Sequence, residues 1–185
     1  MMLIERIVEI VTAPMQNPDM LWMLIPLIIT LLLIEFYFGI YKDELLGWNS
    51  AFGNSIVLLF ISANLFRFAL QNDVESLRMI IALAVFLEAC LLILINLFHL
   101  LPGRVAFKFS SATPINFIAL SSIILVYSNI VIDYLTVLSI IILFVVFSVL
   151  IWLIHKMEPT VEGELTEEAP ENLEAPEVLD APEPD

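Results

Sequence analysis

Four polar side chains lie inside long apolar segments, and they are the residues of this chain with the greatest potential for chemistry. Glu35 follows four consecutive aliphatic residues and precedes Phe36. Glu88 and Asn96 share one face of a second apolar segment, and Asn54 belongs to a polar stripe on a third. Because an ionisable group at the centre of a bilayer costs about 2.5 to 3.5 kcal/mol, such groups are kept for packing or for function. The candidate buried polar or ion site is therefore Glu35, Asn54, Glu88 and Asn96.

Two carboxyl groups in one low-dielectric pocket without a basic partner cannot both be ionised, so at least one is expected to hold a proton. A membrane carboxyl that exchanges its proton between two accessible states is the minimal part of a coupled transporter. Under this hypothesis Glu35 and Glu88 carry a proton or cation, and Asn54 and Asn96 are uncharged ligands. The alternative is that protonated Glu and Asn form hydrogen bonds between helices and hold a bundle or an oligomer together. We favour the structural hypothesis, because the sequence has no inverted repeat and no apolar segment broken by paired Gly and Pro.

The depth of each residue in the bilayer predicts which side chains can meet. With segment midpoints near residues 31, 58 and 89 and antiparallel neighbours, Glu35 and Asn54 each lie about 6 Å from the midplane on the same side. These two side chains are therefore expected to be within reach of a hydrogen bond. Asn96 lies about 10 Å from the midplane on that side, and Glu88 lies close to the midplane. Depth thus predicts one cluster of the four residues.

Two further polar residues are predicted at the membrane interface. Arg67 lies roughly 13 Å from the midplane on the side opposite Glu35, so the two are not an obvious ion pair. Arg67 is expected to snorkel to the interface or to meet Asp73 and Glu75 in the loop that follows. His99 lies near the end of its apolar segment and is expected to contact water.

Sequence motifs of enzymes and metal sites are lacking. The two histidines, His99 and His155, are far apart and form neither an HExxH helix nor a histidine-rich site. The single cysteine, Cys90, allows no intrachain disulfide and no multi-cysteine metal site. There is no GxSxG motif and no phosphate-binding loop of the Walker type. We therefore expect no catalytic activity, no cofactor and no metal ion.

The composition of the chain is that of a membrane protein, and its apolar segments are the elements that must position these residues. Of the 185 residues, 61% are apolar and only 15% are charged, which is outside the range of soluble domains. A span needs about 20 charge-poor residues, and residues 15–156 contain several such runs. We predict an all-α integral membrane protein, a bundle of about five transmembrane helices. The predicted spans are residues 21–41, 48–68, 77–101, 115–132 and 135–154.

The division of the last two spans is the weakest part of this count. Residues 115–154 carry one ionisable side chain, Asp133, yet about forty residues of helix would be about 60 Å long, roughly twice the hydrocarbon thickness. A tight turn near residues 129–134 resolves the difference. The alternative is four spans, with the last helix running well out of the membrane. At the start of the fourth span, Thr113 and Pro114 suit a helix cap and the first helical position.

Two short segments are predicted to lie on the membrane surface. Residues 1–14 form an amphipathic pattern with a narrow polar face of Glu5, Arg6 and Glu9, ended by Pro14. Residues 104–109 alternate polar and apolar side chains and are too short to predict as a strand.

The C-terminal residues 157–185 are predicted to be a disordered acidic tail. They hold eleven of the 21 acidic residues and no base. They also repeat the hexapeptide A-P-E-x-L-[E/D], in which Pro blocks a continuous helix. The tail either keeps the chain soluble by charge or offers repeated weak motifs to a basic or grooved protein partner. Because the acidity belongs to the tail and no basic surface exists, nucleic-acid binding is excluded.

The predicted function follows from architecture alone. We expect a small multi-pass protein, a structural or adaptor subunit of a membrane assembly, whose partners are the lipid bilayer and other copies or other membrane subunits. The alternative is the small proton- or cation-coupled transporter described above. The side with more Lys and Arg in its flanks is expected to be cytoplasmic, which places the tail inside the cell. With five spans that side has Lys42, Arg104, Lys108 and Lys156, and the other has Arg6, Arg67 and Arg78.

Overall fold

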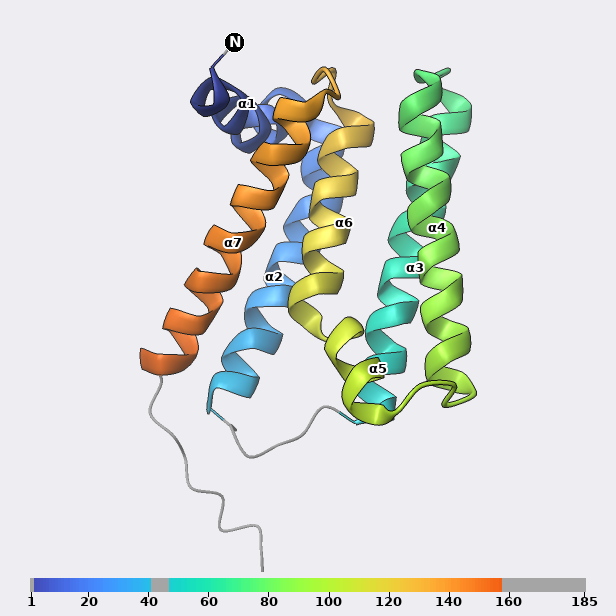
Figure 1. Ribbon diagram of the computed structural model, residues 1–185. Coiled ribbons are helices and arrows are strands. Elements are labelled where there is room, and N and C mark those ends of the chain that lie inside the picture. Colours follow the sequence, from blue (N-terminus) through green and yellow to red (C-terminus); the bar gives the residue numbers. More distant parts are fainter. Residues whose placement is uncertain (1, 41–46, 158–185) are drawn as a thin grey trace, which may run out of the picture.

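The computed structural model describes residues 2–40 and 47–157, and within these residues the chain is helical with no strand (Figure 1). The all-helical prediction is confirmed. The hexapeptide tail lies outside the described residues. The helices are α1 (Leu3–Gln16), α2 (Pro18–Ile40), α3 (Trp48–Gln71), α4 (Ser76–Leu97), α5 (Gly103–Phe109), α6 (Ala112–Tyr127) and α7 (Tyr134–Met157).

Five helical segments are long and apolar enough to cross a membrane, as predicted: α2, α3, α4, the pair α5–α6, and α7. The four-span alternative is wrong, because the chain leaves the helix between α6 and α7. Asp133 caps the start of α7: the backbone N–H of Thr136 donates to Asp133 Oδ1 (2.9 Å), and the N–H of Val137 donates to the Asp133 carbonyl (3.1 Å). This cap starts a new helix at the predicted turn.

The fourth span differs from the predicted one in two ways. Residues 104–109, expected as a surface stretch, belong to the short helix α5, which precedes α6 within the same candidate span. Helix α6 begins at Ala112, with Ser111 as the preceding residue. Thr113 and Pro114 therefore lie in the first turn of α6 and do not cap it. Pro114 is tolerated there because the first N–H groups of a helix have no partner inside the helix.

Helix α6 is the centre of the bundle. It packs against α2, α3, α4 and α7 and also contacts α1. Figure 1 shows it between the α3–α4 pair on one side and α1, α2 and α7 on the other. Its residues Ile115, Ala119, Ile123 and Val126 are almost completely buried. A side chain on α6 can therefore contact either the α3–α4 pair or the group formed by α1, α2 and α7.

The pairing of α3 with α4 depends on small residues. Ala51, Ser55 and Ala69 of α3 and Ala82 and Ala89 of α4 are fully buried. Small side chains let two helix backbones approach closely, which is the usual means of helix association in membranes. These two helices form the most extensive contact between elements.

Helix α1 lies across the end of the bundle where α2 and α7 begin (Figure 1). One expectation for it is corrected: Pro14 does not end the helix, which continues to Gln16. Arg6, one of the residues of the predicted polar face, is only 4% exposed and forms ion pairs with Glu9 (2.7 Å) and Asp133 (3.2 Å). Helix α1 is thereby joined to the α6–α7 connection.

A second buried arginine holds the same connection from the other side. Arg78, in the first turn of α4, donates to the carbonyl oxygens of Leu125 and Ile130 (2.8 Å to the latter). Its Nε atom lies 3.5 Å from a carboxylate oxygen of Glu75. Buried charge is tolerated when hydrogen bonds satisfy it, so Arg78 fixes the end of α6 to α4.

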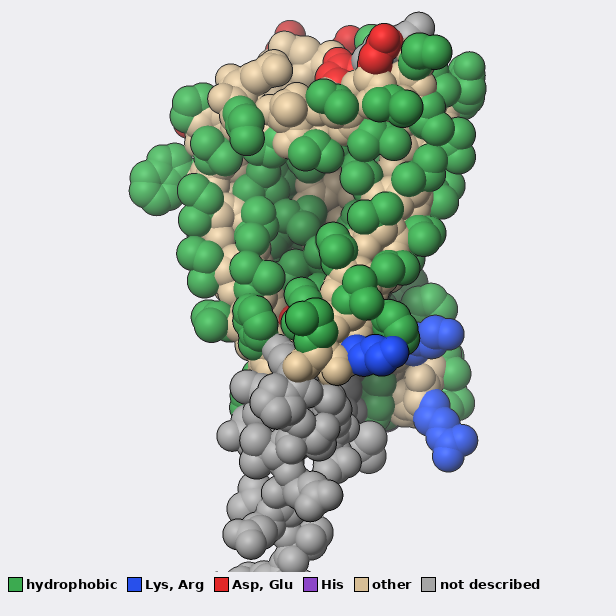
Figure 2. Space-filling model, turned by 90° about the vertical axis from the view of Figure 1, so that its left-hand side faces the viewer, with side chains coloured by type: hydrophobic (Ala, Val, Ile, Leu, Met, Phe, Trp, Pro, Cys, Tyr) green, Lys and Arg blue, Asp and Glu red, His purple; other side chains and the backbone are tan. Residues whose placement is uncertain are grey.

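The net charge of the described residues differs between the two ends of the bundle. In the face shown by Figure 2, acidic side chains gather at the upper end, basic side chains lie at the lower end, and the surface between is mainly apolar. At the end where α2 and α7 finish, the described cations are Arg104, Lys108 and Lys156. This apolar surface between two charged ends is typical of a protein that crosses a bilayer.

Candidate functional site

Asn96 is the most connected polar residue of the bundle interior. It lies at the end of α4 and is 2% exposed. Its Nδ2 atom is within hydrogen-bonding distance of three acceptors, which are Ser55 Oγ (2.8 Å), Ser110 Oγ (2.8 Å) and the Ala51 carbonyl (3.2 Å). The acceptors belong to α3 and to the junction between α5 and α6. One amide group therefore joins three parts of the chain.

Asn54 reaches the same junction. Its Nδ2 donates to the backbone carbonyl of Ser110 (2.8 Å). Ser110 thus accepts one hydrogen bond on its hydroxyl oxygen, from Asn96, and another on its carbonyl oxygen, from Asn54. The structure brings Asn54 and Asn96 together, and Ser110 is the residue between them.

Glu35 lies in a separate group of polar side chains, on the other side of α6. It is 4% exposed, and the hydroxyl of Thr113 donates to its Oε1 (2.8 Å). The Nε2 atom of His155 lies 3.2 Å from Glu35 Oε2 and 3.1 Å from the Glu35 carbonyl. Because a carbonyl oxygen only accepts hydrogen bonds, this contact assigns the proton to Nε2. The expected hydrogen bond between Glu35 and Asn54 is not formed.

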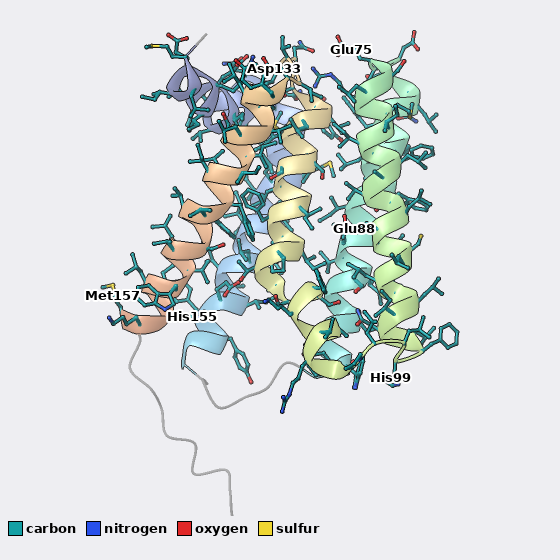
Figure 3. The ribbon with its side chains drawn as sticks, in the orientation of Figure 1. Glu75, Glu88, His99, Asp133, His155 and Met157 are labelled. Carbon is teal, nitrogen blue, oxygen red and sulfur yellow. The ribbon has the colours of Figure 1, made fainter. Side chains whose placement is uncertain are left out.

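The two groups converge on a short piece of chain, residues 110–113, where α5 ends and α6 begins. Ser110 bonds to Asn54 and Asn96, and Thr113 bonds to Glu35. Figure 3 shows the Glu35 partner His155 near the end of α7, at the same end of the bundle as the finish of α4. We call this set the polar layer. It consists of Glu35, Asn54, Ser55, Asn96, Ser110, Thr113 and His155.

Glu88 does not belong to the polar layer. It lies in the middle of α4 and is half-buried, and no hydrogen bond or ion pair joins it to another described residue. Figure 3 places it well away from both His155 and His99. Of the four predicted site residues, the structure brings two together, places Glu35 across α6 from them, and leaves Glu88 separate.

The two predicted interface residues lie at opposite ends of the bundle. Arg67 is exposed, and in the described part of the chain it meets neither Asp73 nor Glu75. His99 is exposed, and its ring contacts the ring of Trp48 edge to face, with centroids 4.1 Å apart. Its backbone is left-handed (φ 51°), and the Leu100 N–H donates to the Ile95 carbonyl (3.0 Å), a bond that closes the end of α4.

Four residues of the polar layer were missed by sequence reasoning: Ser55, Ser110, Thr113 and His155. Thr113 was predicted as a helix cap, and His155 was considered only as one of two distant histidines that form no metal site. His155 did carry a signal, because it is the one ionisable side chain of residues 135–155. Ser55, Ser110 and Thr113 carried no signal that distinguishes them from the other hydroxyl residues of these apolar segments.

Two buried acceptors in this region have no donor among the described residues, Asn96 Oδ1 and Asn116 Oδ1. Asn116 lies one turn after Ala112 in α6, and its amide donates to the Ala112 carbonyl (2.8 Å). Buried acceptors of this kind are usually satisfied by ordered water. In the described ranges no three His, Cys, Asp or Glu side chains gather where they could hold one metal ion.

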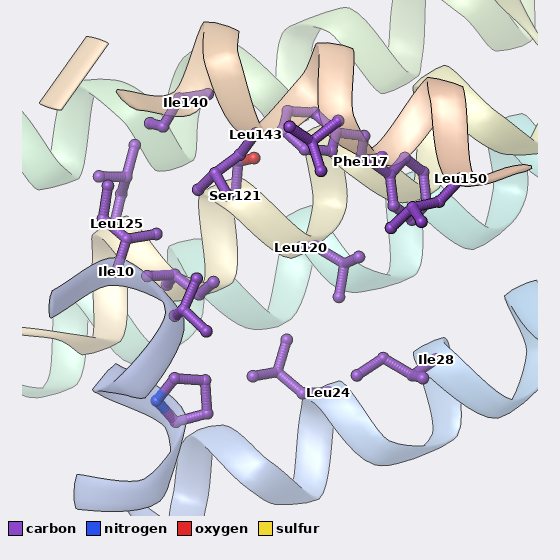
Figure 4. A pocket seen from close by; sticks show the side chains of 15 residues that line it. Ile10, Leu24, Ile28, Phe117, Leu120, Ser121, Leu125, Ile140, Leu143 and Leu150 are labelled. Atoms are coloured by element: carbon purple, nitrogen blue, oxygen red, sulfur yellow. The ribbon is translucent and has the colours of Figure 1, made fainter. Parts of the chain in front are cut away.

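A cavity of about 300 Å³ lies between α1, α2, α6 and α7, away from the polar layer (Figure 4). Apart from the hydroxyl of Ser121, its lining side chains are apolar, among them Leu24, Phe117, Leu143 and Phe147. Without a charged or titratable lining residue, this cavity offers no path for an ion or a proton.

Comparison with known proteins adds no assignment: no family model, no curated protein and no solved structure matches this chain.

Proposed function

We propose that this chain is a multi-pass membrane protein that serves as a structural or adaptor subunit of a membrane assembly. The observation that supports the proposal is the use of its buried polar groups. Asn96, Asn54 and Glu35 each form a hydrogen bond to a residue outside their own helix: the two asparagines bond to Ser110, and Glu35 bonds to Thr113. Groups used in this way hold helices together, which is the usual role of Asn and hydroxyl residues inside membranes.

The basic end of the bundle is proposed to be cytoplasmic. In the sequence, the flanks on this side hold Lys42, Arg104, Lys108 and Lys156, against three arginines at the other end, and Lys and Arg are enriched on the cytoplasmic side of membrane proteins. Because α7 finishes at this end, the acidic tail would extend into the cytoplasm. In this position it is available to a soluble partner with a basic surface or groove.

The adaptor proposal is tested by separating the tail from the bundle. The full chain and a chain ending after Lys156 are expressed in membranes, and the proteins crosslinked to each are quantified. A third variant keeps every acid but changes Leu173, Val178 and Leu179 to Ser. We expect both altered chains to insert and fold while losing the same partner. Retention of all partners by the truncated chain would refute an adaptor tail.

A proton- or cation-coupled transporter is the second candidate, and one observation favours it. Glu88 is a half-buried carboxyl in the middle of a span, and it has no partner among the described residues. Such residues mark proton and ion sites in many transporters. In proteoliposomes under a pH gradient, a transporter predicts proton flux that Glu88→Gln abolishes while the unfolding free energy stays nearly unchanged. Equal flux in both proteins, at the level of empty liposomes, would exclude it.

A further inference from the structure

A second apolar groove reaches the opposite end of the bundle from the polar layer. It has a volume of about 360 Å³ and lies between α2 and α3, with Tyr127 of α6 among its lining residues. Trp22, Leu27, Val57, Phe60 and Ile61 give it largely apolar walls.

The groove runs along the helix axes, in the direction of the bilayer thickness. Thr30, one of its lining residues, is twelve residues from the start of α2, which corresponds to about 18 Å along the helix. Arg67 and Tyr127 line its other end, and Arg67 is one turn, about 6 Å, from the end of α3. The groove therefore extends from headgroup level into the hydrocarbon, across about one half of a bilayer about 30 Å thick.

Arg67 differs from the other two arginines at this end of the bundle. Arg6 and Arg78 are buried and bonded to carboxylates or carbonyls of the chain. Arg67 is exposed and forms no hydrogen bond or ion pair with any described residue. Its guanidinium group presents up to five N–H donors, which suit a phosphate group.

We propose that this groove binds one anionic phospholipid, with an acyl chain along its apolar walls and the phosphate on Arg67. Charge complementarity and depth identify the occupant together. A free phosphate would use Arg67 but would leave the apolar walls empty, and a zwitterionic lipid would offer the cation less net negative charge. Arg67 is the one charged side chain among the described residues that line the groove, so it is the group there that can attract an anion.

The proposal is tested by native mass spectrometry of the full chain in mild detergent. Phosphatidylglycerol and phosphatidylcholine with the same acyl chains are added in equal amounts, and the bound lipids are counted. We expect one phosphatidylglycerol to be retained in preference to phosphatidylcholine. Arg67→Gln should lower this preference about fivefold, the effect of one basic residue near a lipid surface.

Two further variants distinguish lipid binding in the groove from attraction by the net charge of the protein. Arg104→Gln removes an exposed arginine at the opposite end of the bundle and should leave the preference unchanged. Thr30→Phe keeps the charge of Arg67 and fills the deep end of the groove, so it should also release the lipid. Circular dichroism and monodisperse elution show that each variant remains folded.

Three results would overturn the proposal. Equal losses in Arg67→Gln and Arg104→Gln would mean that the preference reflects net charge. Displacement of the lipid by millimolar inorganic phosphate, with no effect of Thr30→Phe, would mean an anion site without a lipid groove. A dimer that Arg67→Gln dissociates, with no lipid adduct, would mean that a second copy of the chain occupies the groove.

Discussion

The buried polar residues divide between those that bond to another element and those that bond within their own helix. Glu35 and Asn96 belong to the first kind, and Ser122 and Ser139 belong to the second. Asn96 and Asn64 provide a matched comparison, since both lie in spans and both donate through Nδ2. Asn96 donates to acceptors of other elements, whereas Asn64 donates to the Phe60 carbonyl of its own helix (2.8 Å). The first kind of bond holds helices together, and the second does not.

Asn96→Ala is therefore expected to destabilise the fold more than Asn64→Ala. Bonds between membrane helices contribute about 0.6 kcal/mol on average and up to about 1.7 kcal/mol, and Asn96 has several acceptors. We expect Asn96→Ala to lower the unfolding free energy by about 1 to 2 kcal/mol, measured by denaturation in mixed micelles. For Asn64→Ala the change should be below about 0.5 kcal/mol. Equal effects would mean that the amide of Asn96 contributes nothing beyond its local helix.

Asp133 gives a pH dependence with a definite sign. The backbone N–H of Thr136 lowers the pKa of Asp133, aided by the Thr136 hydroxyl and by Arg6, while partial desolvation opposes the shift. A carboxyl whose pKa is lower in the folded state stabilises the fold above its unfolded pKa, about 3.9. This contribution is lost as the pH falls through the lower pKa of the folded state.

Asp133→Asn should therefore reduce the unfolding free energy at pH 7, and the difference from the unaltered protein should shrink as the pH falls below about 4. Asp73→Asn, on the exposed α3–α4 loop, is the control and should show no such convergence. A difference that stays constant down to about pH 2 would contradict the ionic role of Asp133.

The pairing of individual residues was only partly predictable. Depth along each helix correctly places Glu35, Asn54 and Asn96 toward the same end of the bundle. Depth does not specify the direction around the helix axis, and α6 stands between α2 and the α3–α4 pair. Glu35 consequently meets Thr113 and His155, while the asparagines meet Ser110.

At the scale of elements, the five helical segments long and apolar enough to cross a membrane could be predicted, because the length and hydropathy of each run can be read directly from the sequence. The turn after α6 could be predicted because a single helix of residues 115–154 would be too long. The break between α5 and α6 could not, since Ser110 and Ser111 resemble the other serines of the spans. Ser110 differs from the other serines in its partners, Asn54 and Asn96, and the sequence does not reveal that these residues meet at the end of α5.

The α6–α7 connection depends on Arg78, and this dependence can be measured. Arg78→Met removes the donors of the Leu125 and Ile130 carbonyls. Hydrogen bonds from a charged group contribute about 1.5 to 3 kcal/mol. We expect the opening free energy of residues 128–133 to fall by about 2 kcal/mol in amide hydrogen exchange.

Arg67→Met is the control for this experiment, because Arg67 lies at the same end of the bundle without a bond to the described residues. Exchange at residues 128–133 should be unchanged in that variant. If the two variants accelerate exchange equally, the connection depends on the charge of this end and not on the bonds of Arg78.

At the scale of the whole molecule, α6 unites two halves that have different polar contents. The α3–α4 half supplies Asn54 and Asn96, and the α2–α7 half supplies Glu35 and His155. Both halves bond to residues 110–113. The polar layer is therefore a junction that holds the bundle together, and within it Glu35 is a sealed, hydrogen-bonded partner of Thr113 and His155.

The most direct measurement of that claim is carbodiimide labelling of the full chain in native membranes, read by mass spectrometry from about pH 5 to pH 8. We predict that Glu35 stays unlabelled throughout this range and reacts only after denaturation, because the residue is 4% exposed and both of its carboxylate oxygens are bonded. Labelling of Glu35 that varies with pH near neutrality would contradict the account. Such a carboxyl would be open to solvent and able to exchange its proton, as a transporter requires.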